Sequence, residues 1–274
     1  SGSAYLQAQI DSNDPAVIAG ITPNSSVGVN NILFITVGSG AITTATAANL
    51  NTINDATTQK ITIASQLQTV TGSASTLKTT FDNNSQFTGL TGAVAVVNST
   101  TESASDIDAL VSSNPDKIDI SAVTTLTGNL TQINTFRNAF GNAKFIGAAG
   151  NGANGAQGSS VTTVTLDTVT NVDASDLHTA KGNFRGTVNG AAVFNMNNIT
   201  TLVDGYSALK DVIDDTAHFT NLTGKAITAN DGTGITTAEA NTLNAFTSGK
   251  VTATIQTDNA NVATLNNADA ATWS

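Results

Sequence analysis

The sequence contains no cysteine, which excludes disulfide bonds and thiolate metal sites. A chain of 274 residues without cysteine is expected outside the cell, among secreted proteins that fold without disulfides. Aromatic residues are also scarce, at 5% of the chain, with two Tyr and a single Trp, Trp273. Sugar-cleaving clefts are usually rich in aromatic side chains, so this scarcity disfavours an enzyme that acts on glycans.

Charged residues make up 11% of the chain, which is less than half of the usual share of about 25%. Twenty acidic residues outweigh ten basic ones, the net charge is −10, and the basic residues form no cluster. Without such a cluster the chain cannot neutralise phosphates, so nucleic-acid binding is excluded. Long apolar runs are missing too. The run from Ala93 to Val97 is far shorter than the roughly 20 residues that a membrane span needs.

Seven short segments begin alike, at intervals of about thirty residues. Each opens with Thr, Ser, Asn or Asp, continues with small residues and then reaches Leu or Ile. They begin at Thr44, Ser73, Ser103, Asn129, Asp173, Asp204 and Thr237, with spacings of 29, 30, 26, 44, 31 and 33 residues. A fixed period in this range indicates a repeat fold, in which each unit stacks on its neighbours.

Each segment predicts one short helix followed by two short strands. Apolar residues recur at helical spacing after each opening, and Ser103 with Asp106 and Thr236 with Glu239 have the spacing of a capping box. Apolar residues then alternate with polar ones in 60–63, 117–120 and 250–255, as in half-buried strands. A second β segment is expected to end in a Thr-Gly turn at 70–72, 90–92, 126–128 and 222–224. Equivalent strands run the same way, so the fold class is predicted as α/β, a solenoid of about seven coils with parallel strand ladders.

The period also predicts the boundaries of the repeats. Residues 1–41 fit poorly and are expected to be a degenerate N-terminal coil or cap, and residues 42–265 to be the repeats. Residues 266–274 are expected to be a tail from a truncated repeat, so the chain is predicted to be part of a longer array. The longest spacing contains the Gly-, Ala- and Asn-rich run 147–160, which predicts an insertion that loops out from one coil.

Three stretches carry a family resemblance: Asp119–Gly128 (DISAVTTLTG), Val172–Leu177 (VDASDL) and Thr236–Ile255 (TTAEANTLNAFTSGKVTATI). They are similar to the repeats of very large cell-surface proteins and exoproteins of cyanobacteria, which pair a helix with VDAS–VTTLTG-like strands. The resemblance extends loosely over residues 42–265 and weakens around 184–198 and in the Gly-rich insertion. It implies a place at the cell exterior and a role in surface coat, motility or adhesion. The repeats of that family carry no catalytic residue.

The residues give little support to catalysis. The two histidines, His178 and His218, are not accompanied by a nucleophile elbow. Asp214 and Asp215 are adjacent carboxylates of the kind that glycosidases use, but aromatic residues are too few for a sugar cleft. We therefore expect no enzymatic activity and no catalytic residues.

Calcium is the one ligand that the sequence suggests. This cation prefers six to eight oxygen ligands, and acidic residues lie close together at several places. The candidates are Asp211 with Asp214 and Asp215, Asp116 with Asp119, Asp106 with Asp108, and Asp11 with Asp14. None of them matches the EF-hand loop or the Gly-rich calcium-binding nonapeptide. The alternative is that these carboxylates cap helices or face water, with no cofactor at all.

The sequence thus predicts a non-enzymatic, extracellular structural protein, a surface coat or filament-forming scaffold that self-associates with other copies. The alternative is a calcium-dependent adhesin module that binds a surface glycan or another surface protein. Alternating Thr residues raise ice binding as a third function, which would need one Thr ladder across nearly every coil. That ladder is broken, because Asp119 in Lys-Ile-Asp-Ile stands where Thr62 stands in Lys-Ile-Thr-Ile.

Overall fold

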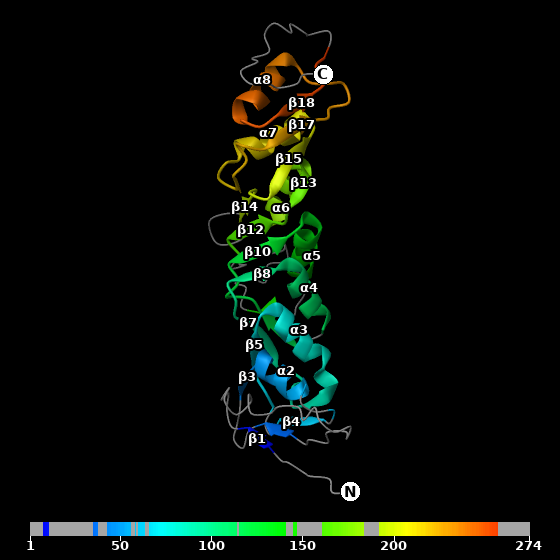
Figure 1. Cartoon of the computed structure of the whole chain (residues 1–274), viewed down its shortest axis with the longest axis vertical. Helices are drawn as coiled ribbons and strands as arrows, with labels where there is room; N and C mark the ends of the chain where they lie inside the picture. The colour runs from blue at the N-terminus through cyan, green and yellow to red at the C-terminus, as the bar shows by residue number, and fades with distance from the viewer. Residues whose placement is uncertain are drawn as a thin grey trace, which may run out of the picture. The chain divides into compact units, whose positions relative to one another are not determined.

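The computed structural model describes residues 8–10, 35–37, 43–55, 58, 60–63, 66–113, 115–140, 145–146, 161–183 and 192–256. Within these ranges, seven α-helices alternate with short strands that form four sheets (Figure 1). Neighbouring strands run parallel in both units described below. The predicted α/β class with parallel ladders is therefore confirmed. Among the described helices, none has the length and apolar character that a membrane span requires.

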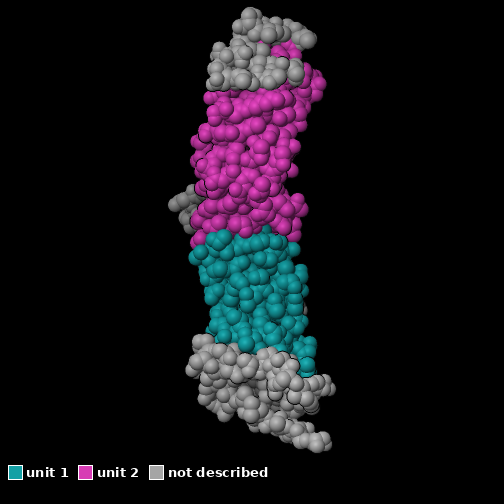
Figure 2. Space-filling model, viewed as in Figure 1, with its two compact units in different colours: residues 1–123, 139–149 teal, residues 124–138, 150–274 magenta. Residues whose placement is uncertain are grey.

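The chain divides into two compact units, residues 1–123 with 139–149 and residues 124–138 with 150–274 (Figure 2). The helices of unit 1 are α2 (Ala47–Asp55), α3 (Ala74–Asp82), the short 3-10 helix η1 (Asn84–Gln86) and α4 (Ala104–Ser112). One sheet of unit 1 has the order β1 (Ala8–Ile10), β2 (Ile35–Val37), β4 (Ile61–Ile63) and β6 (Phe87–Thr88). The other has the order β3 (Thr44–Thr46), β5 (Thr69–Gly72), β7 (Val94–Val97), β9 (Lys117–Asp119) and β11 (Phe145–Ile146). Strand β8 (Thr101–Ser103) leads directly into α4.

Unit 2 repeats this plan. Its helices are α5 (Leu130–Phe140, whose last two residues belong to unit 1), α6 (Ala174–Asn183), α7 (Tyr206–Asp214) and α8 (Thr237–Phe246). In one sheet of unit 2, β10 (Thr125–Gly128), β12 (Thr163–Leu166), β14 (Val193–Asn195) and β16 (Phe219–Thr220) lie side by side. The other has the order β13 (Val169–Asp173), β15 (Ile199–Asp204), β17 (Ala226–Ala229) and β18 (Val251–Ala253).

Strand partners are separated by nearly the same number of residues at each step. Thr44 pairs with Thr69 and Thr69 with Val94, two steps of 25 residues. The longest step joins Thr125 to Thr163 across 38 residues, and it contains the fourteen residues 147–160. Without those fourteen the step would be 24 residues, close to the steps of 25, and the insertion stays a prediction. The insertion itself lies outside the described residues, as do the predicted tail 266–274 and most of residues 1–41.

The core is formed by the apolar residues that alternate with polar ones along the strands. Leu126, Val164, Phe194 and Phe219 occupy aligned positions on β10, β12, β14 and β16, and each is at most 2% exposed. Burying each of these side chains stabilises the fold by about 1.5–3 kcal/mol. In unit 1, α3 buries a narrow apolar stripe of its own, which includes Leu77 and Phe81. Each repeat therefore completes its core with the apolar residues of the next one.

The seven described helices begin within three residues of the predicted positions. The capping box at Thr236 and Glu239 is confirmed, because Thr236 Oγ1 accepts from Glu239 N and Glu239 Oε2 accepts from Thr236 N. The box predicted at Ser103 and Asp106 is wrong. The Ser103 hydroxyl is bonded to Ser105 Oγ at 2.7 Å and makes no capping bond to α4.

The predicted Thr-Gly turns are confirmed at two of the four places. Residues 90–92 and 222–224 lie in turns that follow β6 and β16, whereas 70–72 and 126–128 remain within β5 and β10, so the turn prediction is wrong there. The difference lies in the residue that follows the short strands β6 and β16. Gly89 has a φ of 89° and Asn221 a φ of 64°, and this left-handed conformation ends the strand.

Candidate functional site

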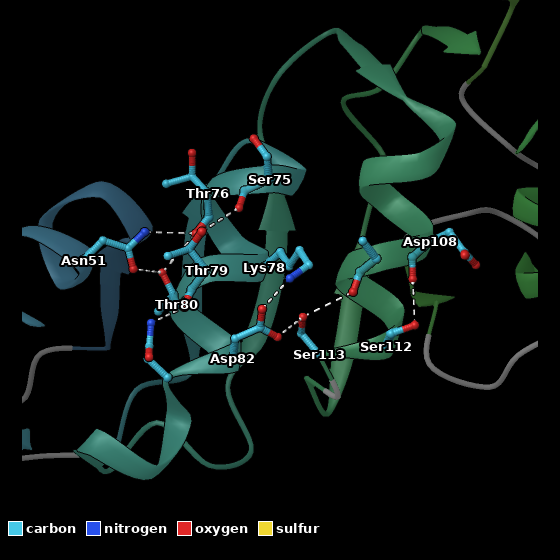
Figure 3. A network of polar contacts seen from close by, with 12 residues as sticks. Asn51, Ser75, Thr76, Lys78, Thr79, Thr80, Asp82, Asp108, Ser112 and Ser113 are labelled. Carbon is cyan, nitrogen blue, oxygen red and sulfur yellow. Dashed lines mark hydrogen bonds and ion pairs between the residues drawn. The ribbon is translucent and has the colours of Figure 1, made fainter. Parts of the chain in front are cut away.

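Many polar contacts join one repeat to the next. Three of them are networks of side chains, and two of these networks involve the helices of unit 1. The first link connects α2 to α3 (Figure 3). Thr80 is fully buried, so its hydroxyl needs a partner inside the protein, and it donates to Asn51 Oδ1 at 2.8 Å. Asn51 Nδ2 in turn donates to the Thr76 carbonyl at 3.1 Å. The pair holds the two helices in one register.

The same network continues from α3 to α4 (Figure 3). Asp82 forms an ion pair with Lys78 one turn earlier and accepts a hydrogen bond from Ser113 Oγ at 2.5 Å, at the end of α4. The hydrogen bonds from Lys78 and Ser113 lower the pKa of Asp82, since they outweigh the opposing effect of burial. Both members of the ion pair are about two-fifths exposed, so the pair itself contributes little to stability.

Carboxylates from one repeat cap helices of the preceding repeat. Glu102 is 6% exposed, and its Oε1 accepts from Ala74 N at 3.1 Å, at the start of α3. Asp204 Oδ2 accepts from Ser175 N at 2.9 Å at the start of α6, and Asp231 Oδ2 from Tyr206 N at 2.7 Å at the start of α7. A helix N-terminus favours negative charge and exposes unpaired N–H groups, so each carboxylate satisfies both needs.

These caps were not predicted from the sequence, although a pattern for them exists. Each acidic residue follows the N–H that it binds by 28, 29 or 25 residues, which is about one repeat. At α6 the cap is doubled, because Asp173 Oδ1 also accepts from Ser175 N, at 3.1 Å. The pKa of Asp173 is lowered, first by the hydrogen bond that the Ser175 hydroxyl donates to it.

The third link is an ionic cluster in unit 2 that joins α6 to the segment after α7. Asp215 binds Lys181 Nζ through Oδ2 at 2.5 Å and His218 Nδ1 through Oδ1 at 2.6 Å. The three side chains are 20–30% exposed, and Lys181 Nζ lies 5.9 Å from the centre of the Phe219 ring. Burial raises the pKa of Asp215, but the hydrogen bonds and charges of Lys181 and His218 outweigh it, so the net effect lowers the pKa.

The carboxylates of the predicted calcium sites have varied surroundings. Asp211 is exposed on α7, Asp214 forms an ion pair with Lys210, and Asp215 belongs to the cluster above. Asp116 is exposed before β9, and Asp119 Oδ1 accepts from its own turn, at Ser121 N. Asp106 and Asp108 are half-buried on α4, and Asp11 and Asp14 lie outside the described residues.

Nowhere in the described ranges do three or more His, Asp or Glu side chains come together as a metal-binding group. Calcium binding therefore stays a prediction, with Asp214 and Asp215 already paired to cations of the protein. His178 is exposed on α6, and His218 contacts Asp215. Several of these polar groups, such as Glu102, Asp204 and Asp215, hold neighbouring repeats together within the fold.

No family model, curated protein or solved structure matches this chain. The resemblance to cyanobacterial surface repeats accordingly stays a prediction.

Proposed function

We propose that this chain is a solenoid of about seven coils, each with one short helix and two short strands, and that it works as a non-enzymatic scaffold through self-association. The observation that carries the proposal is the recurring strand ladder, in which Thr44, Thr69 and Val94 pair at steps of 25 residues. A coil that presents one surface to the coil before it and a complementary surface to the coil after it can accept another copy at either end. Contacts of this head-to-tail kind produce filaments when they do not close.

The low charge of the chain supports the same proposal. Proteins usually protect exposed strand edges with charged residues, which prevents pairing between chains. Here only 11% of the residues are charged, and several described ones are engaged within the fold, such as Glu102 and Asp215. We infer that the scaffold lies outside the cell, because the chain contains no cysteine and resembles cyanobacterial surface repeats.

Sedimentation velocity and negative-stain imaging over a range of protein concentrations, in calcium and in EDTA, test this function. We expect a concentration-dependent rise in mass that is the same in both buffers. A chain that stays monomeric at every concentration would contradict the proposal. Assembly that dissolves in EDTA and returns with calcium, but not with magnesium, would favour the calcium-dependent adhesin instead.

A further inference from the structure

In one sheet of unit 2, the outward-facing residues of four neighbouring strands carry no charge. The inward residues of β10, β12, β14 and β16 form the core described above, so the alternate residues point outward. We call this surface the Thr face. It consists of Thr125, Thr127, Thr163, Thr165, Asn195 and Thr220, with Val193 between them, and all are half-buried.

The strand register arranges the Thr face in two straight rows. Thr127, Thr165, Asn195 and Thr220 are aligned across the four strands, and Thr125 and Thr163 are aligned with Val193. Neighbouring strands lie about 4.8 Å apart, and alternate residues of a strand about 6.6 Å apart. The result is a regular grid of methyl and hydroxyl groups, interrupted only by one amide and one valine.

This composition suits burial against another surface. Thr and Val are β-branched and hold few rotamers, so ordering them in an interface costs little entropy. No Lys, Arg, Asp or Glu on the grid would lose its hydration there, and no buried charge would remain unpaired. The face has no aromatic residue to stack on a sugar and no basic residue to bind a phosphate.

The charge of the molecule indicates which partner meets this face. With a net charge of −10, two copies repel each other, and the repulsion is least where uncharged surfaces meet. Exposed charges of unit 2 lie on the helices, at Asp176, Asp211 and Asp214, and at Asp167, which directly follows β12 at the border of the grid. Two identical grids are also complementary to each other, because rows of one fit between rows of the other when related by a two-fold axis.

We infer that the Thr face binds the Thr face of a second copy of this chain. The inference rests on the proposed self-association and adds a lateral contact to it, distinct from head-to-tail stacking. It predicts that assembly depends on Thr165, near the middle of the grid.

The first test compares Thr165→Lys with Thr135→Lys by sedimentation velocity. Thr135 is exposed on α5 of the same unit, so the control adds the same charge to the helical side. We expect Thr165→Lys to weaken lateral association on the order of tenfold or more, because two facing ammonium groups are desolvated and repel each other. Thr135→Lys should associate like the parent chain. Circular dichroism and thermal unfolding establish that both variants fold.

The second test uses the absence of native cysteine, which makes any introduced thiol unique. Single variants Thr125→Cys, Thr163→Cys, Thr165→Cys and Thr220→Cys are oxidised at low protein concentration. We expect a disulfide-linked dimer for at least one of them, because a disulfide requires Cβ atoms within about 4.5 Å. Thr135→Cys should remain monomeric under the same conditions.

The outcomes separate this inference from the proposed function. If Thr165→Lys still associates and no cysteine on the grid forms a cross-link, the Thr face is not the contact between copies, and the proposed head-to-tail assembly still stands. A chain that never associates overturns both. If the protein instead stays monomeric and changes the shape of growing ice crystals, and Thr165→Lys does not, then the Thr face binds ordered water and not a second copy.

Discussion

At the scale of single residues, two related hexapeptides show how the repeat tolerates change. Phe87–Gly92 and Phe219–Gly224 differ at the position that ends the strand, which is Gly89 in one and Asn221 in the other. Asn221 is the one non-glycine residue with positive φ among those described, and Asn is the residue that best replaces glycine there. The side chain also donates to Asn195 Oδ1 at 3.0 Å.

Replacing Asn221 by alanine tests this backbone requirement. We expect Asn221→Ala to be less stable than Asn221→Gly by about 1 kcal/mol, because alanine is strained at positive φ and glycine is not. Both variants lose the hydrogen bond to Asn195, so the difference between their free energies of unfolding reports the backbone strain alone. Urea denaturation measures it, and equal stability of the two variants would contradict the explanation.

Gly249 lies where the backbones of neighbouring repeats approach each other closely. A Cβ atom there would lie 2.3 Å from the Lys225 carbonyl oxygen, at the start of β17. We expect Gly249→Ala to cost roughly 2–3 kcal/mol, because backbone atoms must move apart. Gly224 is the matched control, since a Cβ there meets nothing within 4 Å. A loss for Gly249→Ala no larger than that for Gly224→Ala would show that the two repeats are not in close contact.

At the scale of elements, the acidic caps couple the helix of one repeat to the strand of the next. We expect Glu102→Ala to destabilise the protein by about 1–3 kcal/mol, because Ala74 N loses its acceptor at a buried helix start. Asp106→Ala provides the control: this residue lies in the first turn of α4, where only a favourable dipole interaction of about 0.3–1 kcal/mol is lost. Chemical denaturation compares them, and equal losses would mean that the inter-repeat bond adds nothing.

The ionic cluster of Lys181, Asp215 and His218 should stabilise the fold less at low pH. The folded protein lowers the pKa of Asp215 below its usual value of about 3.9, so the folded state binds the proton less well than the unfolded state. The resulting stability is present at neutral pH and is lost as pH falls through the pKa of the folded state. We therefore expect Asp215→Asn to lower Tm at pH 7, and the difference from the parent chain to shrink as the pH falls below about 4.

Asp211→Asn removes the same charge from the adjoining helix α7 without breaking an ion pair seen in the structure, so it controls for net charge. Scanning calorimetry between pH 2.5 and 7 gives the comparison. A Tm difference between Asp215→Asn and the parent chain that stays constant over this range would contradict the assigned role of the cluster.

Local patterns predict the elements of this fold well, and long-range partners poorly. The caps at Ser73 and Thr236 and the alternation at Ile61–Ile63 act within a few residues, so the sequence shows them directly. Glu102 and Thr80 act on residues about one repeat away, and nothing in their immediate neighbours distinguishes them from solvated polar residues. The turn at residues 90–92 is local in the same way, because Gly89 ends the strand and the Thr-Gly pair after it forms the turn.

At the scale of the whole molecule, the net charge of −10 opposes any contact between copies. Interfaces built from ion pairs weaken as salt is added, whereas an uncharged interface between like-charged molecules strengthens, because salt screens their repulsion. The Thr face is of the second kind. Salt dependence therefore reports on the chemistry of the contact as well as on its existence.

We expect self-association to become stronger as NaCl rises from about 0.05 to 0.5 M, over which the screening length shortens from more than 10 Å to about 4 Å. Sedimentation velocity at fixed protein concentration measures the change, and unfolding in the same buffers verifies that the monomer is unaltered. The Thr165→Lys variant separates the two contributions. It carries less net negative charge and should repel less, yet it should associate more weakly than the parent chain at every salt concentration. Association that weakens steadily with salt would place ion pairs, and not the Thr face, at the contact between copies.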